Sequence, residues 1–259
     1  MAVLASVKNL TKQYGHFTAV DNISFEVNAG EIVAIIGPNG CGKTSAVECL
    51  AGLRKPTAGA TAIFGQDPNA NQRSRKEIYK RFGIQLQESA YLEKIRVEEI
   101  CAWFASFYDN PASYTKLLTQ LGLADKKKDK VGKLSGGQKQ RLSILLAILP
   151  RPKMLILDEL TTGLDPEARR SIWEILKVIK QDGVGILLVS HFMDEVEYLA
   201  DRIIFMQGGK TLYSGTLAGL KTFAEANLPP DRRQPDMTLE EIYLAFAPTQ
   251  PIATLEGLS

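Results

Sequence analysis

The chain has 259 residues, 45% of them hydrophobic, and its 31 Lys and Arg nearly balance 29 Asp and Glu, leaving a formal charge of +2. This composition allows one large domain or two small ones, each with a hydrophobic core. The balanced charge argues against a protein that coats nucleic acid, but it does not exclude a local basic patch. The widely spaced Cys41, Cys49 and Cys101 fit neither a disulfide framework nor a zinc site, so we expect the protein to reside in a reducing cytoplasm. We find no signal-peptide pattern, and no apolar run reaches the roughly 18 residues of a spanning helix, so we expect any membrane role to come through a partner.

Residues 1 to 36 alternate short apolar and polar stretches, which predicts a largely antiparallel β layer leading into a buried strand, "EIVAII". That strand runs into "GPNGCGKT" (residues 37–44), a complete G-x-x-x-x-G-K-[ST] pattern, and the helical "SAVECLAGL" follows. Backbone N–H groups of such a loop would wrap a β-phosphate, while Lys43 would reach the β and γ oxygens and Thr44 would bind Mg²⁺. A chance glycine turn is the alternative, and the flanking strand and helix disfavour it. The residues expected to hold a nucleotide here are Gly37, Pro38, Asn39, Gly40, Cys41, Gly42, Lys43, Thr44 and Ser45.

Tyr14 is an aromatic residue ahead of this loop, and its ring could stack on an adenine. A partly buried tyrosine at a sheet edge is nearly as good an explanation. His16 is expected to be an ordinary loop residue.

Residues from Glu88 to about Pro150 read as helical with no convincing strand, which predicts an inserted helical subdomain. The basic run "KKKDK" (Lys126–Lys130) within it is expected to be a solvated loop rather than a lipid-facing patch.

The stretch "KLSGGQKQRLS" (residues 133–143) reads first as a helix start. Ser135 and Gln138 fit a capping box, and leucines recur at i, i+3, i+4 and i+7 as a core-facing stripe, namely Leu142, Leu145, Leu146 and Leu149. The adjacent Gly136 and Gly137 are not explained in this way, because glycine costs about 1 kcal/mol in a helix interior and is best tolerated where another molecule comes close.

Two continuous apolar runs, Met154–Asp158 and Gly185–Ser190, predict parallel strands covered on both faces, joined through a helix over Pro166–Gln181. Ligands collect at the carboxyl edge of such a sheet. Asp158 would there hold Mg²⁺, and Glu159 could act as the base that orients or deprotonates the attacking water. Taken alone, paired acids more often just end a strand in solvent, but the phosphate loop upstream reverses that preference.

His191 follows the second of these runs at the same edge, so we expect it to contact the γ-phosphate or the attacking water, although a single histidine is more often structural. After it come two last short strands, "RIIFM" and "KTLYS", and a Pro-rich polar segment over residues 227–236. The final helical stretch, "TLEEIYLAF", begins with a capping box formed by Thr238 and Glu241.

Five motifs in this order, the phosphate loop, "LSGGQ", "LILDE", "TGLDP" and "SH", resemble an ATP-binding-cassette (ABC) ATPase over almost the whole chain. The resemblance implies an α/β P-loop NTPase fold with a mixed central sheet, an N-terminal antiparallel β layer and an inserted helical subdomain. It places the ATPase domain at residues 1–225, with the helical subdomain at about 88–150, and a linker, short helix and tail at 226–259. In that family the LSGGQ loop binds the γ-phosphate of ATP held by a second, antiparallel copy.

The resemblance also assigns roles to single residues. Gln87 resembles the glutamine that links the Mg²⁺ and water region to a membrane partner, with Gln85 as the less favoured choice. Asp165 resembles the acidic residue that crosses the dimer interface, and Glu159 and His191 resemble the catalytic pair. The implied nucleotide ligands from the second copy are Ser135, Gly136, Gly137 and Gln138, and the implied Mg²⁺ ligands are Thr44, Gln87 and Asp158.

Two departures from the family pattern stand out. Leu160 replaces the usual proline after Glu159, which could alter the path toward Asp165, and "ESAYLEKIRVEEI" (residues 88–100) differs from the commoner threonine-containing version where such domains meet a membrane protein.

The C-terminal third resembles a bacterial branch that works with separate six-helix permeases, often in export. We therefore expect an ATPase subunit that uses ATP and Mg²⁺ in a sandwich dimer and couples to a membrane permease, peripheral on the inner face of the cell membrane. A second copy is the favoured cassette partner over a paralogue, and no nucleic acid is expected. A soluble ABC ATPase of DNA repair, chromosome organisation or translation is the alternative. A non-catalytic scaffold is disfavoured, because it would be expected to lack Glu159 or His191.

Overall fold

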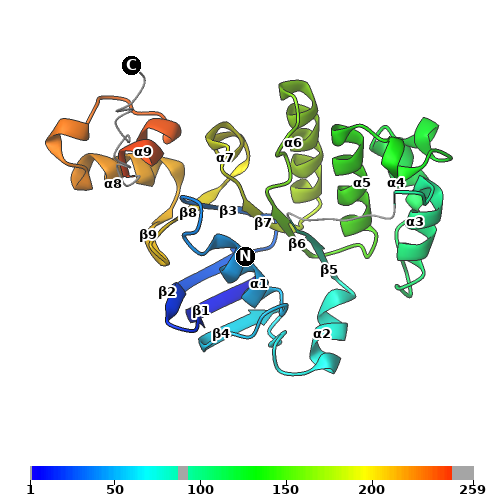
Figure 1. Ribbon diagram of the computed structural model, residues 1–259, viewed down its shortest axis with the longest axis horizontal. Helices are drawn as coiled ribbons and strands as arrows, with labels where there is room; N and C mark the ends of the chain where they lie inside the picture. The colour runs from blue at the N-terminus through cyan, green and yellow to red at the C-terminus, as the bar shows by residue number, and fades with distance from the viewer. Residues whose placement is uncertain (1, 87–92, 247–259) are drawn as a thin grey trace, which may run out of the picture.

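Two sheets of different design make up the core of the protein, which a computed structural model describes for residues 2–86 and 93–246 (Figure 1). The smaller sheet is antiparallel, in the order β2-β1-β4, and consists of β1 (Val3–Tyr14), β2 (Phe17–Asn28) and β4 (Ala58–Ile63). The larger sheet has the order β5-β6-β7-β3-β8-β9. Its members are β3 (Ile32–Ile36), β5 (Phe82–Gln85), β6 (Met154–Asp158), β7 (Gly185–Val189), β8 (Arg202–Gln207) and β9 (Lys210–Gly215), and only β9 runs antiparallel to its neighbour. The predicted α/β class with a mixed sheet and an antiparallel layer is confirmed.

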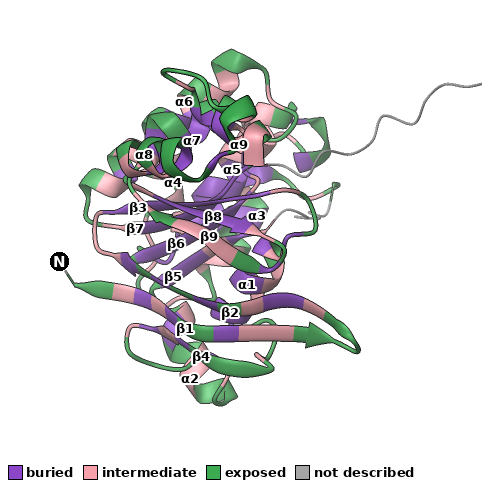
Figure 2. Ribbon diagram, turned by 90° about the vertical axis from the view of Figure 1, so that its left-hand side faces the viewer, coloured by how far each residue is buried: buried purple, intermediate pink, exposed green. Residues whose placement is uncertain are grey.

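Every residue of β3, β6 and β7 is buried, as the continuous apolar runs predict (Figure 2). Alternate side chains enter different cores: Ile156 packs with α1 (Lys43–Leu50) and the antiparallel sheet, whereas Leu155 and Leu157 pack with α6 (Pro166–Gln181). The sheet is therefore held between two apolar layers, and its carboxyl edge is left to carry polar groups.

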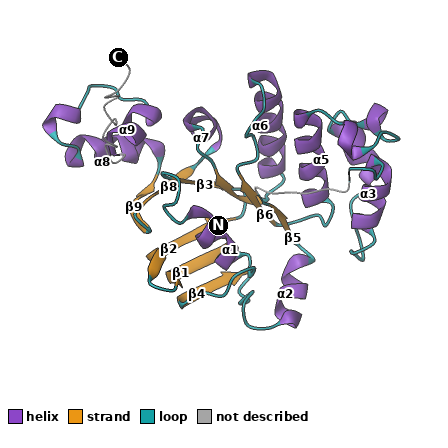
Figure 3. Ribbon diagram, in the orientation of Figure 1, coloured by secondary structure: helices purple, strands orange, loops and turns teal. Residues whose placement is uncertain are grey.

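The described part of the predicted helical subdomain, residues 93–150, contains α3 (Val97–Ala105), α4 (Tyr114–Gln120) and α5 (Gly136–Ile148), and no strand (Figure 3). The predicted leucine stripe of α5 is buried in a core shared with α3 and α4, so its prediction is confirmed. The basic run in this region lies in a surface segment, where Lys127 contacts Glu98 at 3.5 Å.

The C-terminal part packs onto the main sheet. It contains α7 (Met193–Leu199), α8 (Leu217–Asn227) and α9 (Leu239–Phe246), and the buried Leu220, Leu239 and Ile242 share a core with Phe205 of β8. The capping box of α9 is confirmed, because the Glu241 carboxylate accepts from the Thr238 N–H at 2.7 Å. Sequence analysis did not predict α8, nor α2 (Gln72–Tyr79), β4 and β5. None of the helices in the described ranges is both long and apolar enough to cross a bilayer.

Candidate nucleotide site

The loop between β3 and α1 is shaped by glycines whose positions admit no side chain. Gly37 has φ 150° and Gly42 has φ 101°. A Cβ at Gly37 would lie 2.2 Å from the Met206 carbonyl oxygen, and one at Gly42 would lie 2.1 Å from the Ala19 carbonyl oxygen. The antiparallel sheet and β8 thus pack closely against the loop on two sides, and this packing fixes the loop conformation in which an anion would bind.

Lys43 is folded into this loop. Its ammonium donates to the carbonyl oxygens of Gly37 at 2.7 Å and Pro38 at 3.2 Å, and the residue is only 6% exposed. Cys41 is also buried, and burial raises the pKa of its thiol. The loop therefore holds a buried positive charge beside backbone N–H groups at the start of α1, an arrangement that attracts phosphate.

Asp158 ends β6 at the same edge of the sheet. It is 1% exposed, and neither carboxylate oxygen has a hydrogen-bond partner among the described residues. Burial, and then the neighbouring Glu159, raise the pKa of Asp158 to about 6, while Lys43 and the Thr44 hydroxyl pull it the other way.

Unsatisfied carboxylate oxygens close to a hydroxyl form a hard oxygen donor set, which suits Mg²⁺. Among residues 2–86 and 93–246, no group of three acidic, His or Cys side chains could hold a metal by itself. Mg²⁺ in phosphate sites typically uses one or two protein ligands together with phosphate oxygens, so Asp158 and Thr44 fit such an ion.

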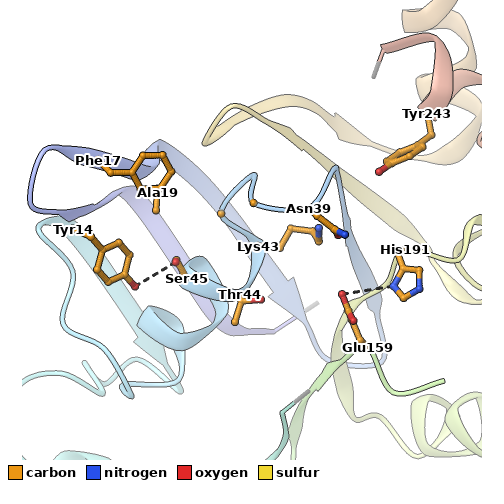
Figure 4. Close-up of a pocket in the computed structure, with 12 residues that line it drawn as sticks. Tyr14, Phe17, Ala19, Asn39, Lys43, Thr44, Ser45, Glu159, His191 and Tyr243 are labelled. Atoms are coloured by element: carbon orange, nitrogen blue, oxygen red, sulfur yellow. Dashed lines mark hydrogen bonds and ion pairs between the residues drawn. The ribbon is translucent and has the colours of Figure 1, made fainter. Parts of the chain in front are cut away.

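Glu159 and His191 face each other across the ends of two neighbouring parallel strands (Figure 4). The Glu159 Oε1 atom lies 3.6 Å from His191 Nδ1, and the two side chains are 14% and 36% exposed. The backbone N–H of Glu159 donates to the Val189 carbonyl at 2.9 Å, and its φ of 51° turns the chain away from the sheet. A partly buried carboxylate beside an imidazole can accept and hold a proton from water.

Glu159 and His191 line one open cleft of about 730 Å³, together with Asn39, Gly40 and Gly42 to Ser45 of the loop. Tyr14 lies at one end, and its hydroxyl is 3.3 Å from Ser45 Oγ. Sequence analysis missed two aromatic residues of the lining: Phe17, which is 61% exposed, and Tyr243 of α9, at the opposite end of the cleft from Tyr14 (Figure 4). The sequence signal for Phe17 is its place three residues after Tyr14, whereas no local pattern links Tyr243 to the phosphate loop.

The LSGGQ stretch forms the start of α5, and its capping box is confirmed. The Ser135 N–H donates to Gln138 Oε1 at 3.0 Å, and the Gln138 N–H donates to Ser135 Oγ at 3.3 Å. A Cβ at Gly137 would lie 3.3 Å from Ala168 Cβ, so close packing on α6 explains part of the need for glycine there. A Cβ at Gly136 would meet nothing nearer than Leu164 at 3.7 Å, so Gly136 is not required by its own chain.

A second cleft of about 430 Å³ surrounds this helix start. Asp165 lines it too, and as the N-cap of α6 its Oδ1 accepts from the Ala168 N–H at 2.8 Å. The two clefts have no lining residue in common. The structure thus brings the loop, Glu159, His191 and Tyr14 together, but leaves Ser135 to Gln138 and Asp165 in a separate place.

Gln87 lies outside the described residues. Gln85 is described as a 5% exposed residue of β5, whose Nε2 donates to the Leu86 carbonyl at 2.7 Å.

Comparison with known proteins gives a consistent result. The family model described as ABC transporter matches residues 20–162. The Nod factor export ATP-binding protein I of Burkholderia orbicola (strain AU 1054) is 36% identical over 213 residues, which cover 80% of this chain and 69% of that protein. The probable multidrug ABC transporter ATP-binding protein YbhF of Escherichia coli (strain K12) is 32% identical over 242 residues, or 92% of this chain and 40% of the relative.

Solved structures agree in fold. An ATP-binding subunit of an ABC transporter superposes with a TM-score of 0.80 at 27% identity, covering 93% of this chain and 98% of that one. A bacterial ABC transporter cassette solved as a dimer superposes with a TM-score of 0.74 at 26% identity, covering 83% of this chain and 99% of that one.

Proposed function

The chain belongs to the ABC transporter family of ATPases, and from that premise we propose that it is the ATP-hydrolysing subunit of an exporter, in which two copies enclose ATP and drive a separate membrane permease. Similarity to a Nod factor export protein and to a probable multidrug transporter protein supports export. Similarity to a cassette solved as a dimer supports the pairing of copies.

The observation that carries the proposal is the separation of the two clefts. The cleft with the phosphate loop contains cationic, acidic and imidazole groups but no LSGGQ residue, and the cleft with LSGGQ contains no phosphate-loop residue. The capping box of α5 uses the N–H groups of Ser135 and Gln138, which leaves those of Gly136 and Gly137 at the helix start, where an anion is favoured. A second, antiparallel copy would place each LSGGQ segment over its neighbour's loop, so that two half-sites form one complete site.

In this arrangement the phosphate loop and Lys43 bind the ATP phosphates, and Tyr14 contacts the adenine. Asp158, Thr44 and Gln87 would hold Mg²⁺, which when bound neutralises charge on the phosphate oxygens. Glu159 orients the attacking water and accepts its proton, while His191, 3.6 Å away, stabilises the carboxylate's position and contacts the γ-phosphate. Ser135, Gly136, Gly137, Gln138 and Asp165 of the other copy complete the site.

The work of the cycle comes from a difference in affinity. ATP binds the closed pair of copies better than the open pair, because only the closed pair supplies both half-sites, and hydrolysis removes that preference. Closing and opening would move the attached permease between its inward- and outward-facing states.

Mixing two inactive variants tests the shared site. Lys43→Ala removes the buried cation of the phosphate loop and Ser135→Arg blocks the LSGGQ segment, so each variant alone should have almost no activity. A mixed pair contains one site with an intact loop and an intact LSGGQ segment, so the mixture should recover ATPase activity. The double variant Lys43→Ala/Ser135→Arg, mixed with itself, is the matched control. A mixture as inactive as that control would contradict the shared site.

A second experiment separates the exporter from a soluble ABC ATPase. The chain should be recovered from the membranes of its own cells in detergent, together with an integral membrane protein in stoichiometric amount. Recovery of an active dimer only from the soluble fraction would favour the soluble alternative, and would place the protein away from the inner face of the membrane.

A further inference from the structure

Glu195 is a fully buried carboxylate, 0% exposed, to which the proposed function gives no role. It lies on α7, four residues after His191. Its Oε1 atom accepts two hydrogen bonds, one from the Thr161 hydroxyl at 2.9 Å and one from Trp173 Nε1 at 2.9 Å. Its Oε2 atom is buried with no partner in the described part of the chain. Because burying a carboxylate is costly, these two donors are what keep it there.

Thr161 belongs to the segment that joins Glu159 to Asp165, the one in which Leu160 replaces the family's usual proline. Leu160 is 0% exposed and packs into the core beneath α6. Thr161 is 1% exposed, and its carbonyl accepts from the Leu164 N–H at 3.2 Å. In place of a rigid proline ring, this segment is held by one buried leucine and by one hydroxyl bonded to a carboxylate.

A second contact joins α6, which follows that segment, to the residues after β7. Arg169 of α6 lies with its guanidinium 4.2 Å from the centre of the Phe192 ring and pairs with Asp194 at 2.5 Å. Phe192 directly follows His191. The residues after β7 therefore contact both the Glu159–Asp165 segment and α6, and the contact made by Glu195 is the buried one.

We propose that Glu195 is a positioning residue for ATP hydrolysis, which holds the segment from Glu159 to Asp165 against the helix that follows His191. The inference rests on the proposed function. Glu195 touches no reacting atom; through Thr161 it sets where Glu159 stands relative to His191, and where Asp165 is presented to the second copy. Removing the Thr161 bond should therefore slow the chemical step while leaving nucleotide capture by the loop intact, since the loop is a different segment.

The test is the steady-state ATPase of four single variants. Thr161→Val keeps the shape but removes the donor, and should lower kcat about tenfold or more with KM changed less than about twofold. Thr161→Ser and Glu195→Gln keep a donor and an acceptor respectively, and should retain most of kcat. Tyr198→Phe is the matched control, because the Tyr198 hydroxyl also joins α7 to α6, through Glu174 at 2.5 Å, yet this bond involves no residue between Glu159 and Asp165. It should leave both kcat and KM unchanged.

Thermal unfolding shows whether each variant is folded. The proposal is overturned if folded Thr161→Val keeps its kcat, if Thr161→Ser fails to restore it, or if Tyr198→Phe lowers kcat as much. A structural bond alone would lower the melting temperature in Thr161→Val and Tyr198→Phe without separating their kcat values. Failure of the proposed hydrolytic role is distinct, because the unaltered chain would then show no ATPase activity at all, whereas failure of the export role would leave this comparison of variants unchanged.

Discussion

The protein has two glycine-rich helix starts, and they are built differently. At the start of α1, Gly37 and Gly42 are enclosed by the chain's own backbone, with no room for a Cβ, and the buried Lys43 donates to the carbonyl groups of Gly37 and Pro38. At the start of α5, Gly136 is exposed, and a Cβ there would meet nothing closer than 3.7 Å. The first start needs its glycines to fold; the second leaves one glycine that its own chain does not need.

This difference indicates which half of the proposed site is self-sufficient. The α1 loop already has its shape, its charge and the neighbouring Asp158 and Glu159, so it can bind phosphate within one chain. The α5 start presents backbone N–H groups on an open surface beside Asp165. N–H groups at a helix start favour an anion, and the proposed function supplies one as nucleotide held by a second copy.

Glu159→Gln should give the largest effect on the self-sufficient half. The amide cannot take a proton from water, so kcat should fall by about 10³, while ATP affinity stays within a few-fold because the loop is intact. Single-turnover hydrolysis and equilibrium binding of a fluorescent ATP analogue measure the two separately. Glu225→Gln, at an exposed position of α8, is the control and should match the unaltered chain. Near-normal turnover in Glu159→Gln would mean that another group activates water.

Lys43→Ala should weaken both binding and hydrolysis, since it removes the buried charge from the loop. The expected loss in kcat/KM is about 10² to 10³, the usual effect of deleting one phosphate-stabilising donor. Lys80→Ala, which removes an exposed lysine paired with Glu77, should have no effect. If Lys43→Ala binds ATP as well as Lys80→Ala does, phosphate is not held by this loop.

Two glycine substitutions compare the helix starts directly. Gly42→Ala forces a Cβ against the Ala19 carbonyl in a left-handed conformation, and should lower the free energy of unfolding by about 3 kcal/mol or more. Gly136→Ala should change it by less than about 1 kcal/mol, while weakening ATP-dependent pairing of copies. Urea unfolding and sedimentation measure the two properties. Equal destabilisation by both substitutions would show that the fold needs Gly136 as much as it needs Gly42.

The main strands of the fold and most residues of the phosphate-loop cleft could be predicted from the sequence. The strands β3, β6 and β7 are continuous apolar runs, and helix α6 carries its own N-cap in Asp165, so local patterns were sufficient. The strands missed were of another kind: half of β4 is exposed, in one continuous run, and β5 is only four residues long, so neither has a clear period. Tyr243 enters the cleft because α8 and α9 fold back onto β8, and Glu195 meets Thr161 across 34 residues. Such contacts depend on tertiary packing, which no local pattern encodes.

Burial of the Asp158 carboxylate should lower the free energy of unfolding at neutral pH. Its pKa is raised to about 6 from 3.8, so between these pH values the folded chain retains a proton that the unfolded chain has lost. The free energy of unfolding therefore falls as pH rises through about 6, and stays lowered above it. Asp158→Asn lacks this loss. In the absence of nucleotide and Mg²⁺ it should gain about 1.4 kcal/mol relative to the unaltered chain between pH 5 and pH 7.5.

Urea unfolding at the two pH values checks this prediction, with Asp182→Asn, in the C-cap of α6, as the control that should gain nothing. A stability difference between Asp158→Asn and the unaltered chain that does not change with pH would show that burial does not disfavour the charged carboxylate.

Tyr14→Phe should give the smallest effect. It removes the 3.3 Å contact with Ser45 but keeps the ring, so KM for ATP should change by no more than about threefold. Tyr14→Ala removes the stacking surface and should raise KM by about tenfold. Equal KM values for the two variants would show that the ring does not contact the base.

The most direct test of the account is sedimentation of Glu159→Gln, which should bind ATP without consuming it, compared with Glu159→Gln/Ser135→Arg. The account predicts that Glu159→Gln is a monomer alone and a dimer with ATP and Mg²⁺, and that Ser135→Arg abolishes the dimer while leaving ATP bound to each monomer. A Glu159→Gln/Ser135→Arg chain that pairs as well as its parent would contradict the claim that LSGGQ completes a neighbour's site.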